Sequence, residues 1–139
     1  MSEQNKQVVR RWFEEVWNQG RVETIDELMA TDAVAHGLGA DMHGPEQFKP
    51  FHAQFREAFP NIRIEMQELI AEGDKVAFSY IACGKHDGAL MGFLATGRES
   101  RFSGMGIVRV KNGQIVEGWN VFDQLSMFQQ LGIMQAMPA

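Results

Sequence analysis

Few side chains in this sequence can carry a proton at neutral pH, and they are widely spread. His36 ends the short apolar run Ala33–Ala35, and His86 lies in the glycine-flanked turn Gly84–Gly88. A histidine with an ordinary pKa of about 6.5 can act as a general acid or base near neutral pH without further tuning. Asp123 is the acidic residue at the end of the last predicted strand. We therefore take His36, His86 and Asp123 as candidate catalytic residues.

Each candidate also has a purely structural interpretation. Asp123 directly precedes the helical segment 124–127, and aspartate is strongly preferred as the N-cap of a helix. A lone histidine is more often structural than catalytic. His43, in a glycine-rich loop, and His52, on a stripe of phenylalanines, rank lower as candidates.

Other site chemistries lack support in the sequence. The four histidines are spread over the chain and the single cysteine, Cys83, stands apart from them, so no metal-site spacing is present. Cys83 lies within an apolar strand pattern, and no Gly-x-Ser-x-Gly string occurs, so a cysteine or serine nucleophile is not indicated. We expect neither a metal nor a cofactor.

The first half of the chain reads as helices around one short strand. Apolar residues recur at helical spacing from Val8 to Trp17, and Gly20 is a plausible stop. A shorter helix follows over 22–29, and residues 32–44 indicate a short strand leading into a loop. Segment 45–59 is helical again, but Pro50 predicts that the regular helix begins there, after a separate turn at Pro45.

The second half has a period of two, typical of half-buried strands. Alternation begins at Ile62, and strands are predicted on both sides of a turn at 72–74 and of the Asn112-Gly113 hairpin turn, with a glycine-rich excursion over 84–97. A short helix over 123–132 and a tail over 134–139 close the chain. The order predicts a single α+β domain over residues 1–139, in which helices cover one face of a curved antiparallel sheet.

The register of the Asn112-Gly113 hairpin decides which side chains face the helices. A two-residue loop pairs Lys111 with Gln114, whereas a three-residue loop with a glycine bulge pairs Val110 with Gln114. We favour the second. One face then carries Phe102, Gly104, Gly106, Val108, Val116, Gly118, Asn120 and Phe122. Its glycines either leave room for a cavity or serve only sheet curvature.

An amide in such a cavity floor has two interpretations. Asn120 either binds a ligand carbonyl or hydroxyl, or is a buried structural amide. Tyr80 is the only tyrosine, and its hydroxyl needs a partner if the ring is buried. Large apolar residues that could line a pocket or merely fill the core are Trp12, Trp17, Phe51, Phe55, Phe59, Phe78 and Met91. Among these we assign Trp12, Trp17, Phe55 and Phe59, with Asn120 and Tyr80, to ligand binding.

The opposite face of the hairpin and the overall charge bear on partners. Residues Met105, Ile107, Arg109, Glu117, Trp119 and Val121 make an apolar outer face with one expected ion pair, Arg109 with Glu117. Such a face predicts a homodimer. A net charge of −5 over 139 residues makes nucleic acid and anionic membranes poor partners. The sequence shows no signal peptide and no apolar stretch long enough to span a bilayer, so we expect a cytoplasmic protein.

Several strings, taken in order, resemble the SnoaL-like polyketide (ester) cyclase family of the nuclear transport factor 2-like superfamily. They are Ala58-Phe59-Pro60-Asn61, Glu72-Gly73-Asp74-Lys75-Val76, Gly84-Lys85-His86-Asp87-Gly88, Thr96-Gly97-Arg98, the run from Asn112 to Trp119, and Gln130-Leu131-Gly132. The resemblance covers about residues 5–132 and implies a cone-shaped α+β barrel with a deep apolar pocket, in a homodimer.

The resemblance also implies an activity. Characterised members close a polyketide ring by intramolecular aldol condensation, without metal or cofactor. Aligned on the hairpin turn, the family's catalytic aspartate falls on Asn120 and its histidine on Gly106, so that pair is absent here. The Trp-x-x-x-Asp motif of the broader ester-cyclase branch is present as Trp119 to Asp123.

Three functions therefore remain open. The first is cofactor-independent proton-transfer chemistry on an apolar carbonyl compound, as in a cyclase, isomerase, dehydratase or hydrolase. Asp123 or a histidine would then be the base and Asn120 would stabilise the oxyanion. The second is a non-catalytic binding module for an apolar ligand on the same fold. The third is a purely protein-binding role for the outer sheet face.

Overall fold

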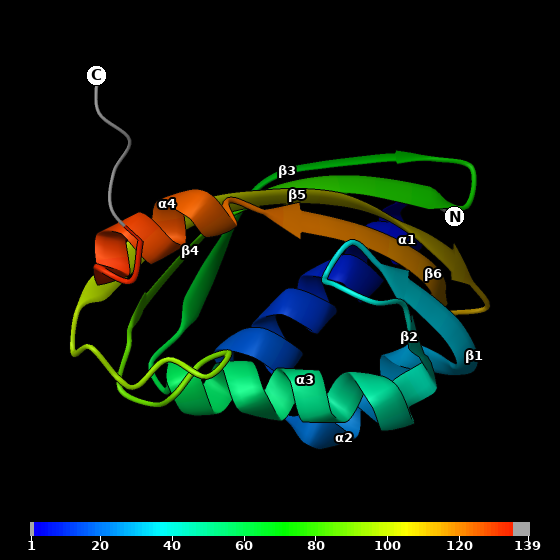
Figure 1. Cartoon of the computed structure of the whole chain (residues 1–139). Coiled ribbons are helices and arrows are strands. Elements are labelled where there is room, and N and C mark those ends of the chain that lie inside the picture. Colours follow the sequence, from blue (N-terminus) through cyan, green and yellow to red (C-terminus); the bar gives the residue numbers. More distant parts are fainter. Residues whose placement is uncertain (1, 135–139) are drawn as a thin grey trace.

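Six strands form one curved sheet, and the helices of the first half of the chain lie against one of its faces (Figure 1). The computed structural model describes residues 2–134. The elements are α1 (Ser2–Arg11), a π-helix η1 (Trp12–Asn18), α2 (Val22–Leu28), β1 (Met29–His36), β2 (Met42–His43), α3 (Gly44–Ala58), β3 (Arg63–Glu72), β4 (Lys75–Lys85), β5 (Glu99–Lys111), β6 (Gln114–Phe122) and α4 (Gln124–Leu131). The predicted α+β class and element order are confirmed, and the tail predicted beyond residue 134 lies outside the described residues.

The sheet is mixed rather than wholly antiparallel. Its strand order is β2-β1-β6-β5-β4-β3, and the pairs β3·β4, β4·β5, β5·β6 and β1·β2 are antiparallel. Strand β1 runs parallel to β6, with Ala35 opposite Gly118 and His36 opposite Trp119. This parallel pair brings His36, from the first half of the chain, beside the C-terminal hairpin.

The first helix changes its winding where its aromatic residues begin. From Trp12 the chain is π-helical, and the backbone N–H of Gln19 donates to the carbonyl of Glu14, five residues earlier, at 2.9 Å. A π-helix takes more residues per turn than an α-helix, so residues five apart, such as Trp12 and Trp17, come to lie on one face. Both tryptophans pack on aromatic rings of α3, whereas Phe13 packs on Phe78 and Tyr80 of the sheet.

Helix α3 is continuous through Pro50, contrary to the predicted break. It begins at Gly44 with Pro45 in its first turn, and residues on both sides of Pro50 are buried, among them Phe48 and Phe55. A proline inside a helix removes one backbone hydrogen bond and costs about 3 kcal/mol. Burial of an unbroken aromatic stripe outweighs this cost, because each buried phenylalanine side chain contributes about 1.5–3 kcal/mol.

The hairpin between β5 and β6 has the tight two-residue loop instead of the three-residue loop that we favour, and its predicted inner face is correct except at Val116, whose place is taken by Ile115. Lys111 pairs with Gln114 across a two-residue loop. A bulge follows, because Val110 pairs with Ile115 while Arg109 pairs with Glu117, which leaves Val116 unpaired. The extra residue reverses the alternation once. Gly106 therefore lies opposite Asn120, on the face that we expected.

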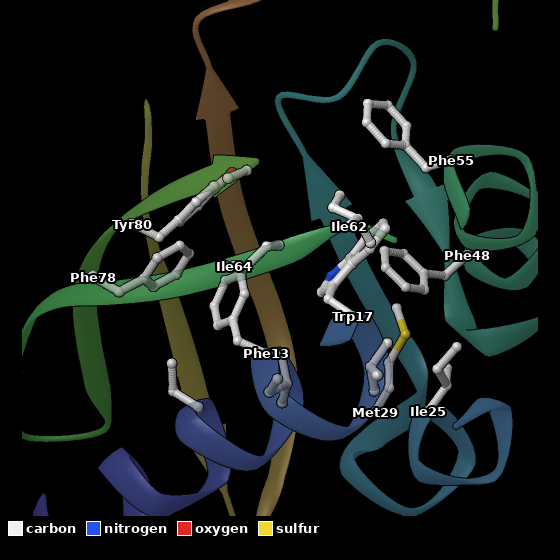
Figure 2. Close-up of a cluster of buried hydrophobic side chains, with 14 of the residues drawn as sticks. Phe13, Trp17, Ile25, Met29, Phe48, Phe55, Ile62, Ile64, Phe78 and Tyr80 are labelled. Carbon is white, nitrogen blue, oxygen red and sulfur yellow. The ribbon is translucent and has the colours of Figure 1, made fainter. Parts of the chain in front are cut away.

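Aromatic rings fill the space above the inner-face glycines. A Cβ atom on Gly104 would lie 2.2 Å from Cζ of Tyr80, and one on Gly106 would lie 2.5 Å from Cζ of Phe78. Of the two interpretations of these glycines, open volume is contradicted at these two positions, because rings of the neighbouring strand β4 lie across them. Figure 2 shows Tyr80 and Phe78 near Phe13 in the resulting core, with Trp17 closer to Phe48.

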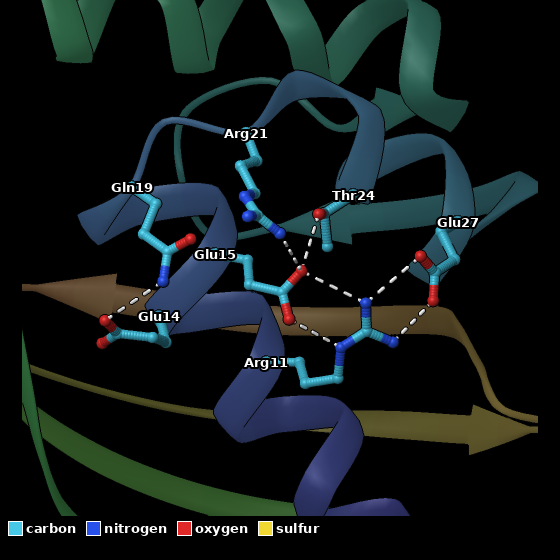
Figure 3. A network of polar contacts seen from close by, with 7 residues as sticks. All are labelled: Arg11, Glu14, Glu15, Gln19, Arg21, Thr24 and Glu27. Atoms are coloured by element: carbon cyan, nitrogen blue, oxygen red, sulfur yellow. Dashed lines mark hydrogen bonds and ion pairs between the residues drawn. The ribbon is translucent and has the colours of Figure 1, made fainter.

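Polar contacts fix the π-helix to its neighbours. Glu15 accepts hydrogen bonds from Arg11 at 2.7 Å and from the hydroxyl of Thr24 in α2 at 2.9 Å (Figure 3). The Arg11 guanidinium lowers the pKa of Glu15 to about 2. At the end of the π-helix, the Asn18 amide bonds to both the carbonyl and the N–H of Ile64, at 2.9 and 2.6 Å. These bonds hold the aromatic helix against α2 and the edge strand β3.

Candidate functional site

Two adjoining cavities lie between the sheet and the helices. The first has a volume of about 60 Å³ and the second of about 30 Å³. Four residues line both cavities and so mark the boundary between them: Phe13, Trp17, Leu38 and Asn120. Sites for drug-sized ligands occupy about 300–1,000 Å³. The described conformation is therefore closed, and a ligand of that size requires wall residues to move.

The walls of both cavities are almost wholly apolar. Trp12 and Phe48 contribute to the first cavity and Phe51, Phe55 and Phe122 to the second. Of the predicted ligand-binding aromatics, Trp12, Trp17 and Phe55 line a cavity. Phe59 does not: it is 1% exposed and stacks between Phe55 and His86. Met91 is also away from both cavities and is 43% exposed.

One hydrogen-bonded pair of side chains lies at the boundary between the cavities. The Tyr80 hydroxyl donates to Oδ1 of Asn120 at 3.0 Å. Burial raises the pKa of Tyr80 to about 12, so the phenol keeps its proton at neutral pH. Within residues 2–134, Nδ2 of Asn120 makes no hydrogen bond. Both amide protons of Asn120 are thus available to a ligand.

The position that the resemblance assigns to the family's catalytic histidine is blocked. Gly106 lies directly opposite Asn120 on β5. A Cβ atom there would lie 2.1 Å from the carbonyl oxygen of Trp119 in addition to its clash with the Phe78 ring. Steric packing thus leaves no room for a histidine beside Asn120.

His36 is among the residues that line the first cavity, but its ring lies with Trp119 and Glu117 on the outer side of the sheet and is held between two carboxylates. Its Nδ1 lies 2.9 Å from Oδ1 of Asp41, and its Nε2 lies 2.8 Å from Oε2 of Glu117. These two hydrogen bonds, the one to Glu117 first, raise the pKa of His36. The ring stacks on Trp119 with a centroid distance of 5.2 Å. Glu117 also forms the predicted ion pair with Arg109, at 3.5 Å.

The loop after His36 inserts one apolar side chain between the cavities. Leu38 stands between Gly37 and Gly39, whose φ angles of +95° and +107° favour glycine. Gly37 is also packed closely on β6, because a Cβ atom there would lie 2.3 Å from the carbonyl oxygen of Asn120. Sequence reasoning missed Leu38, although a lone apolar residue between two glycines in a polar loop is a usable signal.

The structure does not bring Asp123 and His86 to the cavities. Asp123 is exposed and caps α4, where its Oδ1 accepts the backbone N–H of Ser126 at 3.0 Å. His86 is fully buried, and its Nδ1 accepts the backbone N–H of Thr96 at 3.2 Å. This bond ties together the two ends of the excursion over 86–97. Burial lowers the pKa of His86, and its Nε2 has no hydrogen-bond partner among the described residues.

The two lower-ranked histidines also lie away from the cavities. His43 is exposed at the start of α3. His52 is 2% exposed, and its Nε2–H donates to the carbonyl of Val16 at 2.6 Å. Among the residues that line the two cavities, His36 and Tyr80 are therefore the titratable ones. In the described part of the chain, no group of three or more metal-ligating side chains is present, and no helix is long and apolar enough to cross a membrane.

Known proteins share both the sequence pattern and the fold. The chain is 30% identical over 131 residues to aklanonic acid methyl ester cyclase DnrD of Streptomyces peucetius, which covers 90% of this chain and 88% of the relative. The crystal structure of IdmH, a putative polyketide cyclase from Streptomyces antibioticus, superimposes with a TM-score of 0.81 at 32% identity, covering 93% and 99% of the two chains.

A second solved structure extends the likeness in fold. A putative SnoaL-like polyketide cyclase from Jannaschia sp. CCS1 superimposes with a TM-score of 0.87 at 24% identity, over 99% of this chain and 95% of that one. The profile of the SnoaL-like polyketide cyclase family matches residues 7–131. This chain therefore belongs to the SnoaL-like polyketide cyclase family.

Proposed function

We propose that the protein is a cofactor-independent enzyme of the SnoaL-like cyclase type that promotes proton transfer on an apolar carbonyl compound. The observation that carries this proposal is the Asn120 amide, whose Nδ2 is an available donor in otherwise apolar walls. In a site with little water, such a donor stabilises the negative charge that develops on a carbonyl oxygen when a neighbouring C–H loses its proton.

His36 is the group that we propose moves the proton. It is the histidine among the residues that line the first cavity, and its neutral form has a lone pair available to accept a proton. Its ring lies beside Trp119 and Glu117, so in this proposal it turns toward the cavity to act as the base. In the closed conformation both ring nitrogens face carboxylates. Asp41 lies in the same loop as Leu38, so movement of this loop to admit a ligand frees Nδ1. Asp123 keeps its place as a helix cap in this proposal, and His86 as an anchor of the excursion.

The test uses the compound in the name of the Streptomyces peucetius relative. The purified protein is incubated with aklanonic acid methyl ester, and cyclised product and hydrogen–deuterium exchange next to the carbonyl are followed by mass spectrometry. We expect exchange at least about 100-fold above the buffer rate, the lower range for general acid–base catalysis. Asn120→Leu and His36→Gln should each abolish this excess, while Asp123→Asn, at an unchanged melting temperature, should keep it. No exchange above the buffer rate overturns the enzymatic proposal.

The second candidate is a non-catalytic binding module on the same fold. The observation that favours it is the absence of the family's acid/base pair, because Asn120 and the blocked Gly106 stand in those places. Tight binding of the same ester with no exchange and no cyclisation supports this alternative.

We further propose that the outer sheet face joins two copies of the chain. Met105, Val121 and Ile70 are 63%, 61% and 63% exposed, and with Ile107 and Trp119 they line one shallow groove on β3, β5 and β6. A contiguous apolar patch of this kind usually marks an interface. The face is the same on both copies, so a two-fold axis through it closes the assembly.

A further inference from the structure

The Tyr80–Asn120 contact spans a strand that lies between its two partners. Tyr80 is on β4 and Asn120 on β6, with β5 between them. On β5, Gly104 is paired with Tyr80, and Gly106 is paired with Asn120. Because neither glycine has a side chain, the tyrosine ring can lie flat across β5 and its hydroxyl can reach the amide.

Packing allows the Tyr80 ring little freedom. The residue is 4% exposed, and its ring lies 5.2 Å from that of Phe13 and 6.1 Å from that of Phe78, measured between centroids. Gly104 supports the ring from below. A ring held on these sides keeps its hydroxyl in one place, where it donates to Oδ1 of Asn120.

We propose that Tyr80 is a positioning residue that sets ligand specificity: its hydroxyl engages Oδ1 of Asn120 and turns Nδ2 toward the cavities, so the site selects a ligand oxygen that only accepts hydrogen bonds. Ketones, esters and the enolates derived from them have such an oxygen, whereas an alcohol also carries a proton that needs an acceptor. This inference rests on the proposed function, because it concerns the same cavity and the same ligand carbonyl.

The location of the amide also defines where that oxygen lies in the ligand. Asn120 lines both cavities, and apart from His36 in the first and Tyr80 in the second the remaining walls on either side are apolar. A ligand that fills both cavities therefore has its acceptor oxygen near the middle of its length and hydrocarbon on both sides. An alcohol in the same position buries an unpaired O–H, which weakens binding by about tenfold or more.

Two probes of matched shape test the inference: 9-fluorenone and 9-fluorenol, which differ in the oxygen function at the centre of the same three-ring skeleton. Their dissociation constants are measured by calorimetry for the wild-type protein and for Tyr80→Phe, which keeps the ring over Gly104. We expect the wild type to favour the ketone by about tenfold or more, and the variant by no more than about threefold, because the released amide can turn Oδ1 toward the alcohol.

Two further variants separate positioning from a general effect on packing. Phe102→Leu alters the wall of the second cavity without a polar atom and should weaken both probes equally. In an Asn120→Leu background, Tyr80→Phe should leave the ratio unchanged, because no amide remains to be oriented. Melting temperatures of all variants are recorded alongside.

The outcomes are distinguishable. Equal binding of the two probes to the wild type, or a ketone preference that survives Tyr80→Phe, overturns the role of Tyr80 and leaves the carbonyl-binding cavity intact. Failure of 9-fluorenone to bind the wild type overturns the proposed function together with this inference.

Discussion

Three histidines in this chain differ in charge preference because their surroundings differ. His52 and His86 are buried, and burial lowers the pKa of each. His36 lies between Asp41 and Glu117, whose carboxylates raise its pKa. At neutral pH the buried pair is neutral, while His36 is the histidine that retains a proton most readily. Among these three histidines, only His36 is one of the residues that line a cavity.

The pH dependence of turnover follows from that environment. If neutral His36 is the base, kcat/KM rises with pH, and its midpoint lies above the ordinary histidine value of 6.5. Glu117→Gln removes the larger of the causes that raise this pKa, so the midpoint moves down and the variant is more active than the wild type at pH 6.5. Exchange rates between pH 5.5 and 9 measure both.

A control variant isolates the contact with Glu117. Asp74→Asn weakens the other carboxylate partner of Arg109, 3.2 Å away, without touching His36, and should leave the midpoint in place. A rate that falls as pH rises contradicts the assignment of His36 as base and makes it an acid instead.

At the scale of elements, the loop from β1 to β2 and the glycines of β5 define the cavities. The loop closes them through Leu38, and the glycines admit the rings of Phe78 and Tyr80. Both the loop and strand β5 have glycines, which lack a side chain, next to a large apolar group. Substitutions at these positions therefore change access and packing separately.

Shortening Leu38 should speed ligand entry. Leu38→Ala removes the side chain that separates the cavities, so we expect the association rate of 9-fluorenone to increase several-fold in stopped-flow fluorescence. Leu125→Ala is the matched control, since Leu125 is 49% exposed on α4 and lines neither cavity. Equal rates for wild type and Leu38→Ala would show that the loop does not limit entry.

Adding a methyl group to β5 should destabilise the protein. At Gly106 the new Cβ meets the Trp119 carbonyl and the Phe78 ring, so Gly106→Ala should lower the free energy of unfolding by about 1–3 kcal/mol. Gly118→Ala on the adjacent strand is the control, because its nearest neighbour is the Val108 side chain at 3.2 Å. Urea denaturation measures the difference, and a loss at Gly118 as large as that at Gly106 would contradict the packing argument.

The elements show what the sequence could predict and what it could not. Alternation, the position of the Asn112-Gly113 turn and the Asp123 cap depend on neighbours in the chain, and these predictions agree with the structure, although the loop register that we favour at the turn is wrong. The unbroken helix through Pro50, the bulge at Val116 and the parallel β1·β6 pair depend on packing between distant segments. Local sequence patterns do not predict packing between segments that are far apart in the chain.

The candidate site likewise combines residues that local patterns predict with contacts that depend on distant segments. Asn120 and Tyr80 were chosen from the alternation of their strands, and both line a cavity. Their mutual hydrogen bond was not predicted, because Tyr80 and Asn120 lie 40 positions apart in the sequence. Helical spacing predicts Phe59 as a ligand-binding residue, but at the end of α3 its ring lies beside His86 and away from the cavities. The catalytic roles of His36, His86 and Asp123 stay predictions.

At the scale of the whole molecule, association should depend on the outer sheet face. We expect sedimentation velocity to give a dimer for the wild type and a monomer for Val121→Glu, because a buried unpaired charge at a two-fold interface is repeated on both copies. Leu94→Glu is the control, since Leu94 is 84% exposed on the excursion, away from this face. A monomeric wild type contradicts the proposal.

The parallel pairing of β1 with β6 has a consequence for the order in which the protein is made. Residues 29–36 leave the ribosome long before residues 114–122, yet each strand needs the other to complete the wall of the first cavity. Contacts between segments so far apart in the chain are slow to form, and a chain emerging from the ribosome cannot make them early. The helices and the β3·β4 hairpin can assemble first, and the first cavity closes last, after nearly the whole chain has been synthesised.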